Sequence, residues 1–251
     1  MKSVTSDRAV VQRSYGRRRG RRLSQRRLAL LDTLLPQIAI SRLENIINPW
    51  VLFPVRPRAL WLEIGFGSGE HLAAQASRHP DVGFIGCEVF LNGIASALVH
   101  INTRNLSNVR LFPEDIRLLL KILPDNCLER VFLLFPDPWP KKRHIRRRFI
   151  TPTSLDALAR LLHDHCELLV VSDDVTYLRW TLSLVPVHPA FHWLARVPED
   201  WRCPPVDWIT TRYEAKALRA GKCSFYLRFE RKPRLLSKIF EQRVDSVIIG
   251  E

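Results

Sequence analysis

The sequence predicts an α/β protein built on one mostly parallel sheet with helices on both faces. From about residue 59, seven short apolar runs rich in β-branched and aromatic residues alternate with segments of helical periodicity. The early runs are almost wholly apolar, as expected for strands that helices cover on both sides. The 251 residues, 46% of them apolar, supply a substantial core. An integral membrane protein is excluded, because the chain has no run of about 18 uncharged apolar residues.

The elements follow this alternation along the chain. Strands are expected at 59–64, 82–89, 108–112, 130–135, 166–172, 191–197 and 224–230. Helices are expected near 23–35, 69–79, 91–104, 115–122, 152–164, 174–184 and 211–221. Four prolines between residues 28 and 58 favour extended chain over a second domain there, and the Pro-rich segment 198–208 is expected to be a surface loop. We therefore expect a basic, flexible arm over residues 1–35 and one domain over residues 36–251.

Positive charge is concentrated in two segments. Residues 1–27 carry ten Lys and Arg against one acid, and residues 141–148 (KKRHIRRR) carry six cations and no acid. Since the formal net charge is +14, the rest of the chain is close to neutral. Such clusters favour a polyanionic partner, because each neutralised phosphate releases counterions. We expect the N-terminal segment to be a nucleic-acid-binding arm; a solvated tail and an organelle transit peptide are the alternatives.

The cysteines and histidines indicate no metal centre. The five cysteines are scattered, odd in number and never in a C-x-x-C pair, which argues against a disulfide framework and a thiolate metal site. The eight histidines show no metal-ligand spacing, so no metal is expected. A reducing, cytoplasmic setting fits this pattern best.

A glycine-rich turn follows the first expected strand. Glycines at 65, 67 and 69 permit positive φ and close approach of the backbone to a ligand. Compared with the dinucleotide motif G-x-G-x-x-G, the third glycine comes one residue early, and Glu70 would place a charge beside a diphosphate. The turn therefore favours a nucleoside without a charged diphosphate. An NAD-type dehydrogenase is the rival enzyme class, and a purely structural turn is the non-functional alternative.

Acidic residues stand at or just after the ends of the first three strands. Glu88 lies about 20 residues beyond the glycine turn, where a carboxylate can accept both hydroxyls of a ribose. Asp115 could accept from an adenine amino group, and Glu63 could hold a cationic or amino-bearing tail. Taken singly, each could be a solvated charge or a helix cap. Because the carboxyl ends of parallel strands meet in one crevice, together they indicate a pocket for S-adenosylmethionine.

The fourth expected strand ends in a stiff loop, Phe135-Pro-Asp137-Pro-Trp139-Pro-Lys141-Lys-Arg143-His144. Three prolines in five residues fix φ and remove N–H donors, so the loop does not begin a helix. It places the carboxylate of Asp137 and the indole of Trp139 directly before the second basic cluster. An aromatic face for an exposed base beside cations for its phosphates suits chemistry on a nucleobase. A structural Pro-rich turn is the alternative.

Five segments together resemble the bacterial tRNA (guanine-N7-)-methyltransferase family over residues 45–230. They are LEIGFGSGEHL, the acids at 88 and 115, FPDPWPKKRH at 135–144, SDD at 172–174 and TRYEAKALRAG at 211–221. The resemblance implies a single Rossmann-like class I methyltransferase domain with seven strands, the last antiparallel. It also implies S-adenosylmethionine as methyl donor and N7 of the guanosine at tRNA position 46, in the variable loop, as acceptor.

The resemblance also implies roles for individual residues. Donor binding falls to Glu63, Glu88, Asp115 and Asp137, beside the turn of Gly65, Gly67 and Gly69, and Asp137 is also the catalytic residue. Substrate binding falls to Lys141, Asp173, Thr211, Arg212, Tyr213 and Glu214, although Ser172-Asp173-Asp174 stands where the family usually has Thr-Asp-Trp. From the basic run we add Arg143 and Arg146–Arg148 as phosphate contacts.

The expected chemistry requires no general base, because guanine N7 has a lone pair and no proton. Positioning therefore does most of the work. Asp137 would stabilise the cationic product, with Glu214 or Asp173 on the Watson–Crick edge of the base and Trp139 and Tyr213 as stacking partners. We expect tRNA as partner, no required protein partner, and a monomer or homodimer. A non-catalytic RNA-binding module on the same core is the second alternative.

Overall fold

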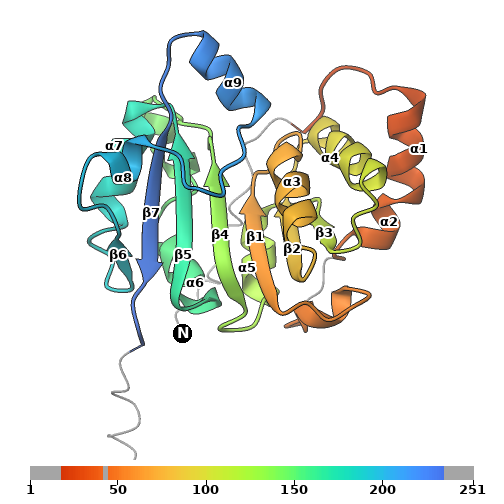
Figure 1. The fold of residues 1–251 in the computed structure, drawn as a ribbon, viewed down its shortest axis with the longest axis horizontal. Coiled ribbons are helices and arrows are strands. Elements are labelled where there is room, and N and C mark those ends of the chain that lie inside the picture. The colour runs from red at the N-terminus through yellow and green to blue at the C-terminus, as the bar shows by residue number, and fades with distance from the viewer. Residues whose placement is uncertain (1–17, 42–44, 235–251) are drawn as a thin grey trace, which may run out of the picture.

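A seven-stranded sheet forms the centre of the protein (Figure 1). The computed structural model describes residues 18–41 and 45–234. Across the sheet the strands run in the order β3 (Val109–Phe112), β2 (Val82–Cys87), β1 (Ala59–Ile64), β4 (Leu128–Leu134), β5 (Leu162–Ser172), β7 (Phe225–Arg231) and β6 (Phe191–Trp193). β7 pairs antiparallel with β5 and β6, whereas the other pairs are parallel. This confirms the predicted mostly parallel sheet with an antiparallel last strand.

Two apolar layers cover the two faces of the sheet. Strand alternation sends Leu60, Leu62 and Ile64 into one layer, and sends Ala59 and Trp61 into the other. The first layer contains α5 (Ile116–Ile122), α6 (Pro152–Leu161) and α7 (Val175–Leu184). The second contains α3 (Glu70–Arg78) and α4 (Leu91–Thr103). By the same alternation, the side chain of Glu63 belongs to the face that α3 and α4 cover.

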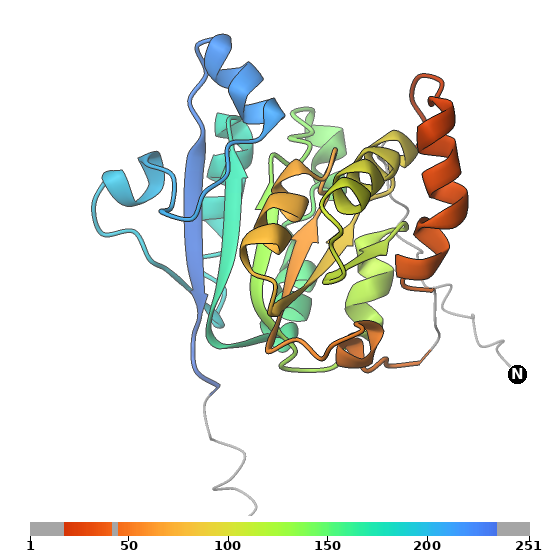
Figure 2. The same cartoon turned by 45° about the vertical axis from the view of Figure 1, so that its right-hand side comes forward.

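Residues 18–41 lie against α4 and β3 (Figure 2). They contain α1 (Gln25–Thr33) and α2 (Leu35–Ile38). The Gly20 N–H donates to Asn92 Oδ1 at 2.7 Å, and the Ile40 N–H donates to the carbonyl of Leu111 at 2.7 Å. Leu30, Leu31, Leu34 and Leu35 pack on the second apolar layer.

This packing differs from the expected flexible arm over residues 1–35. α1 has no fully buried residue and α2 buries Ile38, but half-buried leucines along both helices hold the segment against the second apolar layer. Residues 1–17, the rest of the expected arm, lie outside the described residues. The division into an arm and a domain stays a prediction.

Smaller elements join this frame. They are α8 (Glu199–Arg202), α9 (Arg212–Arg219) and the 3-10 helices η1 (Pro49–Leu52) and η2 (Lys142–Arg147). α8 forms within the expected Pro-rich loop. β5 starts at Leu162, inside the helix expected near 152–164, because Leu162 pairs with Leu128 of β4. α9 lies above the carboxyl ends of the strands (Figure 1). Within the described part of the chain, no helix is both long and apolar enough to cross a membrane.

Candidate active site

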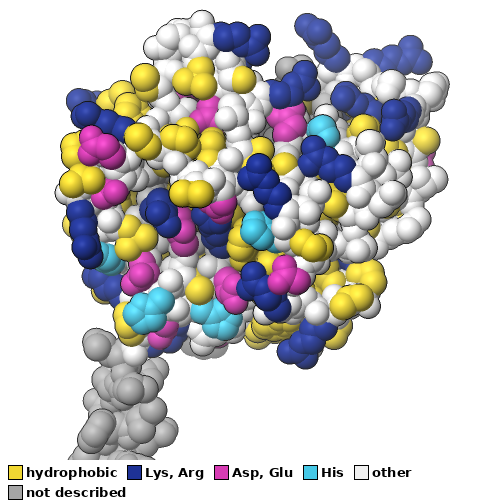
Figure 3. Space-filling model, viewed as in Figure 1, with side chains coloured by type: hydrophobic (Ala, Val, Ile, Leu, Met, Phe, Trp, Pro, Cys, Tyr) yellow, Lys and Arg dark blue, Asp and Glu magenta, His cyan; other side chains and the backbone are white. Residues whose placement is uncertain are grey.

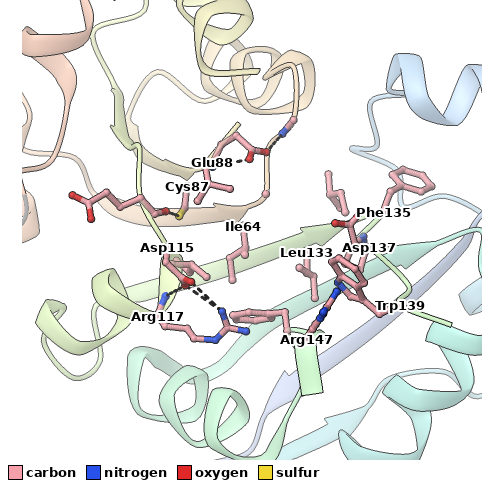
Figure 4. Close-up of a pocket in the computed structure, with 18 of the residues that line it drawn as sticks. Ile64, Cys87, Glu88, Asp115, Arg117, Leu133, Phe135, Asp137, Trp139 and Arg147 are labelled. Carbon is pink, nitrogen blue, oxygen red and sulfur yellow. Dashed lines mark hydrogen bonds and ion pairs between the residues drawn. The ribbon is translucent and has the colours of Figure 1, made fainter. Parts of the chain in front are cut away.

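A cavity of about 410 Å³ opens at the carboxyl ends of β1 to β4 (Figure 4). Glu88 and Asp115 lie on one side of it, and Asp137 and Trp139 lie on the other. The lining also includes Gly65, Gly67, Glu114, Arg117, Phe135, Arg147 and Tyr213. Acids that follow three different strands thus face one space, as the sheet topology requires.

The glycine turn forms one wall of the cavity. Gly65 and Gly67 have φ of +71° and +56°, and a β-carbon added at either residue would meet nothing within 4 Å. The space in front of these two residues is therefore free for a ligand. Gly69 has φ of +76° but does not line the cavity, and an added β-carbon would lie 2.4 Å from that of Ala97. Its role here is close packing of α3 on α4.

Glu88 ties the glycine turn to the segment after β2. One carboxylate oxygen accepts from the Gly67 N–H at 3.0 Å. The other accepts from the N–H groups of Val89 at 2.7 Å and Phe90 at 2.9 Å. Burial raises the pKa of Glu88 and these bonds oppose the rise, while the charge of Asp137 adds to it. A carboxylate has about four lone-pair positions, so Glu88 keeps capacity for a ligand hydroxyl.

Asp115 caps α5 at the same wall. Its carboxylate accepts from the Arg117 backbone N–H at 2.9 Å and pairs with the Arg117 guanidinium at 3.1 Å. The neighbouring Cys87 thiol donates to the carbonyl of Glu114 at 3.1 Å. Burial raises the pKa of Cys87, and the charges of Glu88 and Asp115 raise it further. The thiol is therefore a neutral wall group rather than a nucleophile.

The Pro-rich loop after β4 forms the opposite wall. Phe135 and Trp139 have φ of +47° and +42°, in the left-handed region that costs a residue with a β-carbon about 1–3 kcal/mol. The Phe135 N–H donates to the carbonyl of Val171 at 2.7 Å, which ties the start of the loop to β5. Asp137 is exposed in the middle of the loop and lines the cavity.

The basic run after this loop divides into exposed and inward residues. Lys141, Arg143 and Arg146 are exposed on or beside η2, in keeping with phosphate contacts. Arg147 lines the cavity, with its guanidinium carbon 4.8 Å from the centre of the Trp139 ring. Arg148 is only 3% exposed and donates to backbone carbonyls, so the expectation that it grips phosphate is wrong.

Tyr213 and Asp173 meet at the rim of the cavity. The Tyr213 ring lies 4.9 Å from that of Phe135, and Tyr213 lines the cavity. The Asp173 carboxylate accepts from Lys222 Nζ at 3.1 Å and is also hydrogen-bonded to Tyr213. Burial raises the pKa of Tyr213 and the charge of Asp173 raises it further, so the phenol is neutral at pH 7. Asp174 instead caps α7 by accepting from the Tyr177 N–H at 2.9 Å.

Two expected site carboxylates turn away from the cavity. Glu63 is 3% exposed and accepts from His71 Nδ1 at 2.8 Å, beneath α3. Glu214 is 2% exposed and accepts from Trp208 Nε1 at 2.8 Å and from the Tyr226 hydroxyl. Both accept from buried hydrogen-bond donors, and neither lines the cavity. The expected roles of Glu63 at the methyl donor and of Glu214 at the base edge stay predictions. Glu214 instead anchors α9 on the sheet.

Two further expected substrate residues serve local structure. Thr211 caps α9 by accepting from the Glu214 N–H at 3.1 Å. Arg212 is exposed, and its backbone N–H and guanidinium both bind the carboxylate of Glu70, at 3.2 and 3.4 Å. Neither residue lines the cavity. The TRYE element therefore reaches the cavity through Tyr213, and the roles of all these residues stay predictions.

Sequence reasoning missed Arg117 and Arg147 as lining residues. Arg117 follows the cap residue Asp115 by two positions, a spacing that helix-cap geometry could have revealed. Arg147 stands three residues after His144 on η2, and both side chains reach the Trp139 ring. Among residues 18–41 and 45–234, no group of three or more His, Cys, Asp and Glu is arranged to hold a metal ion.

Comparison with known proteins adds to this geometry. A family model described as a putative methyltransferase matches residues 57–227. A tRNA (guanine-N(7)-)-methyltransferase of Rhodospirillum rubrum is 55% identical over 227 residues, covering 88% of this chain and 89% of that protein. Another, of Paramagnetospirillum magneticum, is 49% identical over 225 residues, covering 88% and 94%. A solved SAM-dependent O-methyltransferase of Thermotoga maritima covers 82% of this chain and 72% of its own, at 17% identity and a TM-score of 0.47.

The two relatives span nearly their whole length on this chain, and the family model covers the sheet from β1 into β7. The chain belongs to the tRNA (guanine-N(7)-)-methyltransferase family.

Proposed function

We propose that this protein transfers the methyl group of S-adenosylmethionine to N7 of the guanine at position 46, in the variable loop of tRNA. The family membership supports the reaction. The observation that carries the proposal is the cavity, which places Glu88 and Asp115 opposite Asp137 and Trp139 (Figure 4). One wall then suits a nucleoside donor, and the other suits a base.

The donor wall fits S-adenosylmethionine. The cavity volume lies in the range of sites for small molecules and cofactors. Open space in front of Gly65 and Gly67 lets the donor approach the backbone. Glu88 would accept from a ribose hydroxyl and Asp115 from the adenine amino group. When bound, the donor supplies an electrophilic methyl group on a sulfonium.

The opposite wall would hold the guanine. Trp139 and Tyr213 offer ring faces that line the cavity, and base–aromatic stacking contributes about 1–3 kcal/mol per base. Asp137 would accept from an N–H of the base and stabilise the positive charge that the purine gains. Because N7 carries no proton, no side chain has to remove one. Desolvation and the surrounding cations lower the pKa of His144, so it is neutral at pH 7 and adds no charge near the base.

Cations surround the cavity on two sides and would bind tRNA phosphates. Figure 3 shows Lys and Arg side chains along the upper edge of the molecule, near α9 and near the segment before α1. The exposed ones include Arg18, Arg21, Arg22, Lys216 and Arg219. The carbonyl of Arg18 accepts from the Leu91 N–H at the start of α4, which places that segment at the carboxyl edge of the sheet. Phosphate contacts of this kind position an RNA without reading its sequence.

The test is methyl transfer to an unmodified tRNA transcript. Purified protein is incubated with tritiated S-adenosylmethionine and tRNA, and the digested RNA is analysed for N7-methylguanosine. A matched transcript with adenosine at position 46 is the control. We expect label in N7-methylguanosine with the first transcript and none with the second. Tight donor binding without label would support the inert RNA-binding module instead, and label at another guanosine would refute the assigned position.

A further inference from the structure

The guanidinium of Arg148 lies buried behind the Pro-rich loop. Its Nε donates to the carbonyl of Pro138 at 2.8 Å, and its Nη2 donates to the carbonyl of Trp139 at 3.3 Å. Its guanidinium carbon lies 5.2 Å from the centre of the Trp180 ring. Trp180 is itself fixed, because its indole N–H donates to the carbonyl of Ile150 at 2.8 Å. The planar guanidinium of Arg148 is thus packed against the Trp180 ring and donates to two consecutive peptide groups.

Among the described residues, no carboxylate lies within 4.0 Å of this guanidinium. Arg148 is 3% exposed, and the groups that face its charge include two carbonyl dipoles and the ring of Trp180. Burying a charge without a counterion is unfavourable, and an apolar side chain would fill the same space without that penalty. A role in global packing therefore does not account for the choice of arginine.

The two carbonyls that Arg148 holds belong to the peptide groups on either side of the Trp139 α-carbon. These are the two planes whose orientation defines the backbone conformation of Trp139, which has φ of +42°. A rigid planar fork that binds both carbonyls can stabilise this left-handed conformation, whereas a lysine ammonium, a point charge on a flexible stem, lacks the fork. Asp137 lies one residue before the first of the two held carbonyls, so its position depends on the same bonds.

We propose that Arg148 is a positioning residue for methyl transfer: it keeps Trp139 in its left-handed conformation and thereby places the indole and the Asp137 carboxylate at the cavity. This inference rests on the proposed function. Because Arg148 does not line the cavity, it acts only through the loop.

The test compares Arg148→Lys and Arg148→Gln with a matched control, Arg110→Lys. Arg110 is likewise buried, donates to the carbonyls of Leu52, Ser107 and Val109, and has its guanidinium carbon 5.0 Å from the Phe53 ring. It lies on β3, outside the cavity lining. The three variants therefore lose similar buried bonds, but only two of them release the loop.

We expect both Arg148 variants to lower kcat by about 10- to 100-fold, the range that misplacement by about 1 Å can produce. KM for tRNA should change less than threefold, because the exposed cations stay in place, and the Kd for S-adenosylmethionine should change less than twofold. Arg110→Lys should lower Tm to a similar extent and keep kcat within twofold of wild type. Tryptophan fluorescence and thermal melts report whether each variant is folded.

Several outcomes would overturn the inference. A folded Arg148 variant with kcat within twofold of wild type would do so, as would an equal loss of kcat in Arg110→Lys. Loss of the folded state in both Arg148 variants, with Arg110→Lys folded, would assign Arg148 to global stability instead. Wild-type protein that transfers no methyl group would refute the proposed function, which separates that failure from failure of the positioning role.

Discussion

Replacement of Asp137 by asparagine removes one charge from the cavity and keeps the size of the side chain. Asp137 is exposed on a loop that its neighbours hold rigidly, so the change should leave the fold intact. A carboxylate about 4 Å from the developing positive charge on guanine stabilises it by about 1 kcal/mol in water and about 4 kcal/mol at the effective dielectric of a protein surface. At about 1.4 kcal/mol per tenfold, the rate should fall by about 5-fold to about 1000-fold. The upper part of this range applies if the bound base excludes water.

The assay is a single-turnover measurement with enzyme in excess over tRNA, so that product release does not mask the chemical step. Asp125→Asn is the matched control, because Asp125 is an exposed carboxylate, outside the cavity lining, that pairs with Arg160. We expect Asp137→Asn to slow transfer and to leave the Kd for tRNA within twofold of wild type. A single-turnover rate within twofold of wild type would refute the electrostatic role of Asp137. So would an equal loss of rate in Asp125→Asn.

Three further predictions follow from burial and charge. Because burial raises the pKa of Glu88, the affinity for S-adenosylmethionine should begin to fall on acidification at a pH above the ordinary pKa range of glutamate. Calorimetry should show that Glu88→Gln binds S-adenosylmethionine weakly and without this pH dependence. Iodoacetamide at pH 8 should modify the exposed Cys203 and Cys223 within minutes but should not modify Cys87, because Cys87 is buried and burial raises its pKa. Peptide mass spectrometry measures the modification, and equally fast modification of Cys87 would contradict this prediction. Residues 1–17 carry four cations and one acid. Their deletion should weaken tRNA binding and reduce the slope of log affinity against log salt concentration by up to about three. An unchanged slope would reject a phosphate-binding arm.

The sequence predicted well those features that depend on short-range patterns. Apolar runs placed all seven strands within a few residues, and the expected acids after β2, β3 and β4 face one cavity because parallel strands end at the same edge. Three prolines correctly indicated a loop after β4. The pattern did not reveal that Phe135 and Trp139 adopt positive φ, because neither residue type favours that region. The residue that holds the backbone of Trp139, Arg148, directly follows the next element, η2.

The burial of individual arginines was harder to predict, because a run of like charges has the same sequence pattern whether its side chains face water or the interior. Arg146, Arg147 and Arg148 are consecutive, yet they are exposed, directed into the cavity and buried, respectively. Arg146 and Arg147 are the last residues of η2, a 3-10 helix that turns about 120° per residue, and Arg148 is its C-cap, so the three side chains point in different directions. Periodicity predicts that the environments of these three arginines differ. The contacts that bury Arg148 come from Trp180 on α7 and from the Pro-rich loop, neither of which the run of arginines itself reveals.

Glu63 and Glu214 show why a carboxylate beside a ligand pocket need not belong to it. Strand alternation directs Glu63 away from its neighbour Ile64, which lines the cavity, and toward the face that α3 covers. There His71, on the first turn of α3, supplies the donor. Glu214 faces the indole of Trp208 and the phenol of Tyr226, so the residue beside it, Tyr213, points to the cavity. In both cases a buried acid fixes the element that carries a lining residue, and its loss should displace that element before it changes any contact with the base.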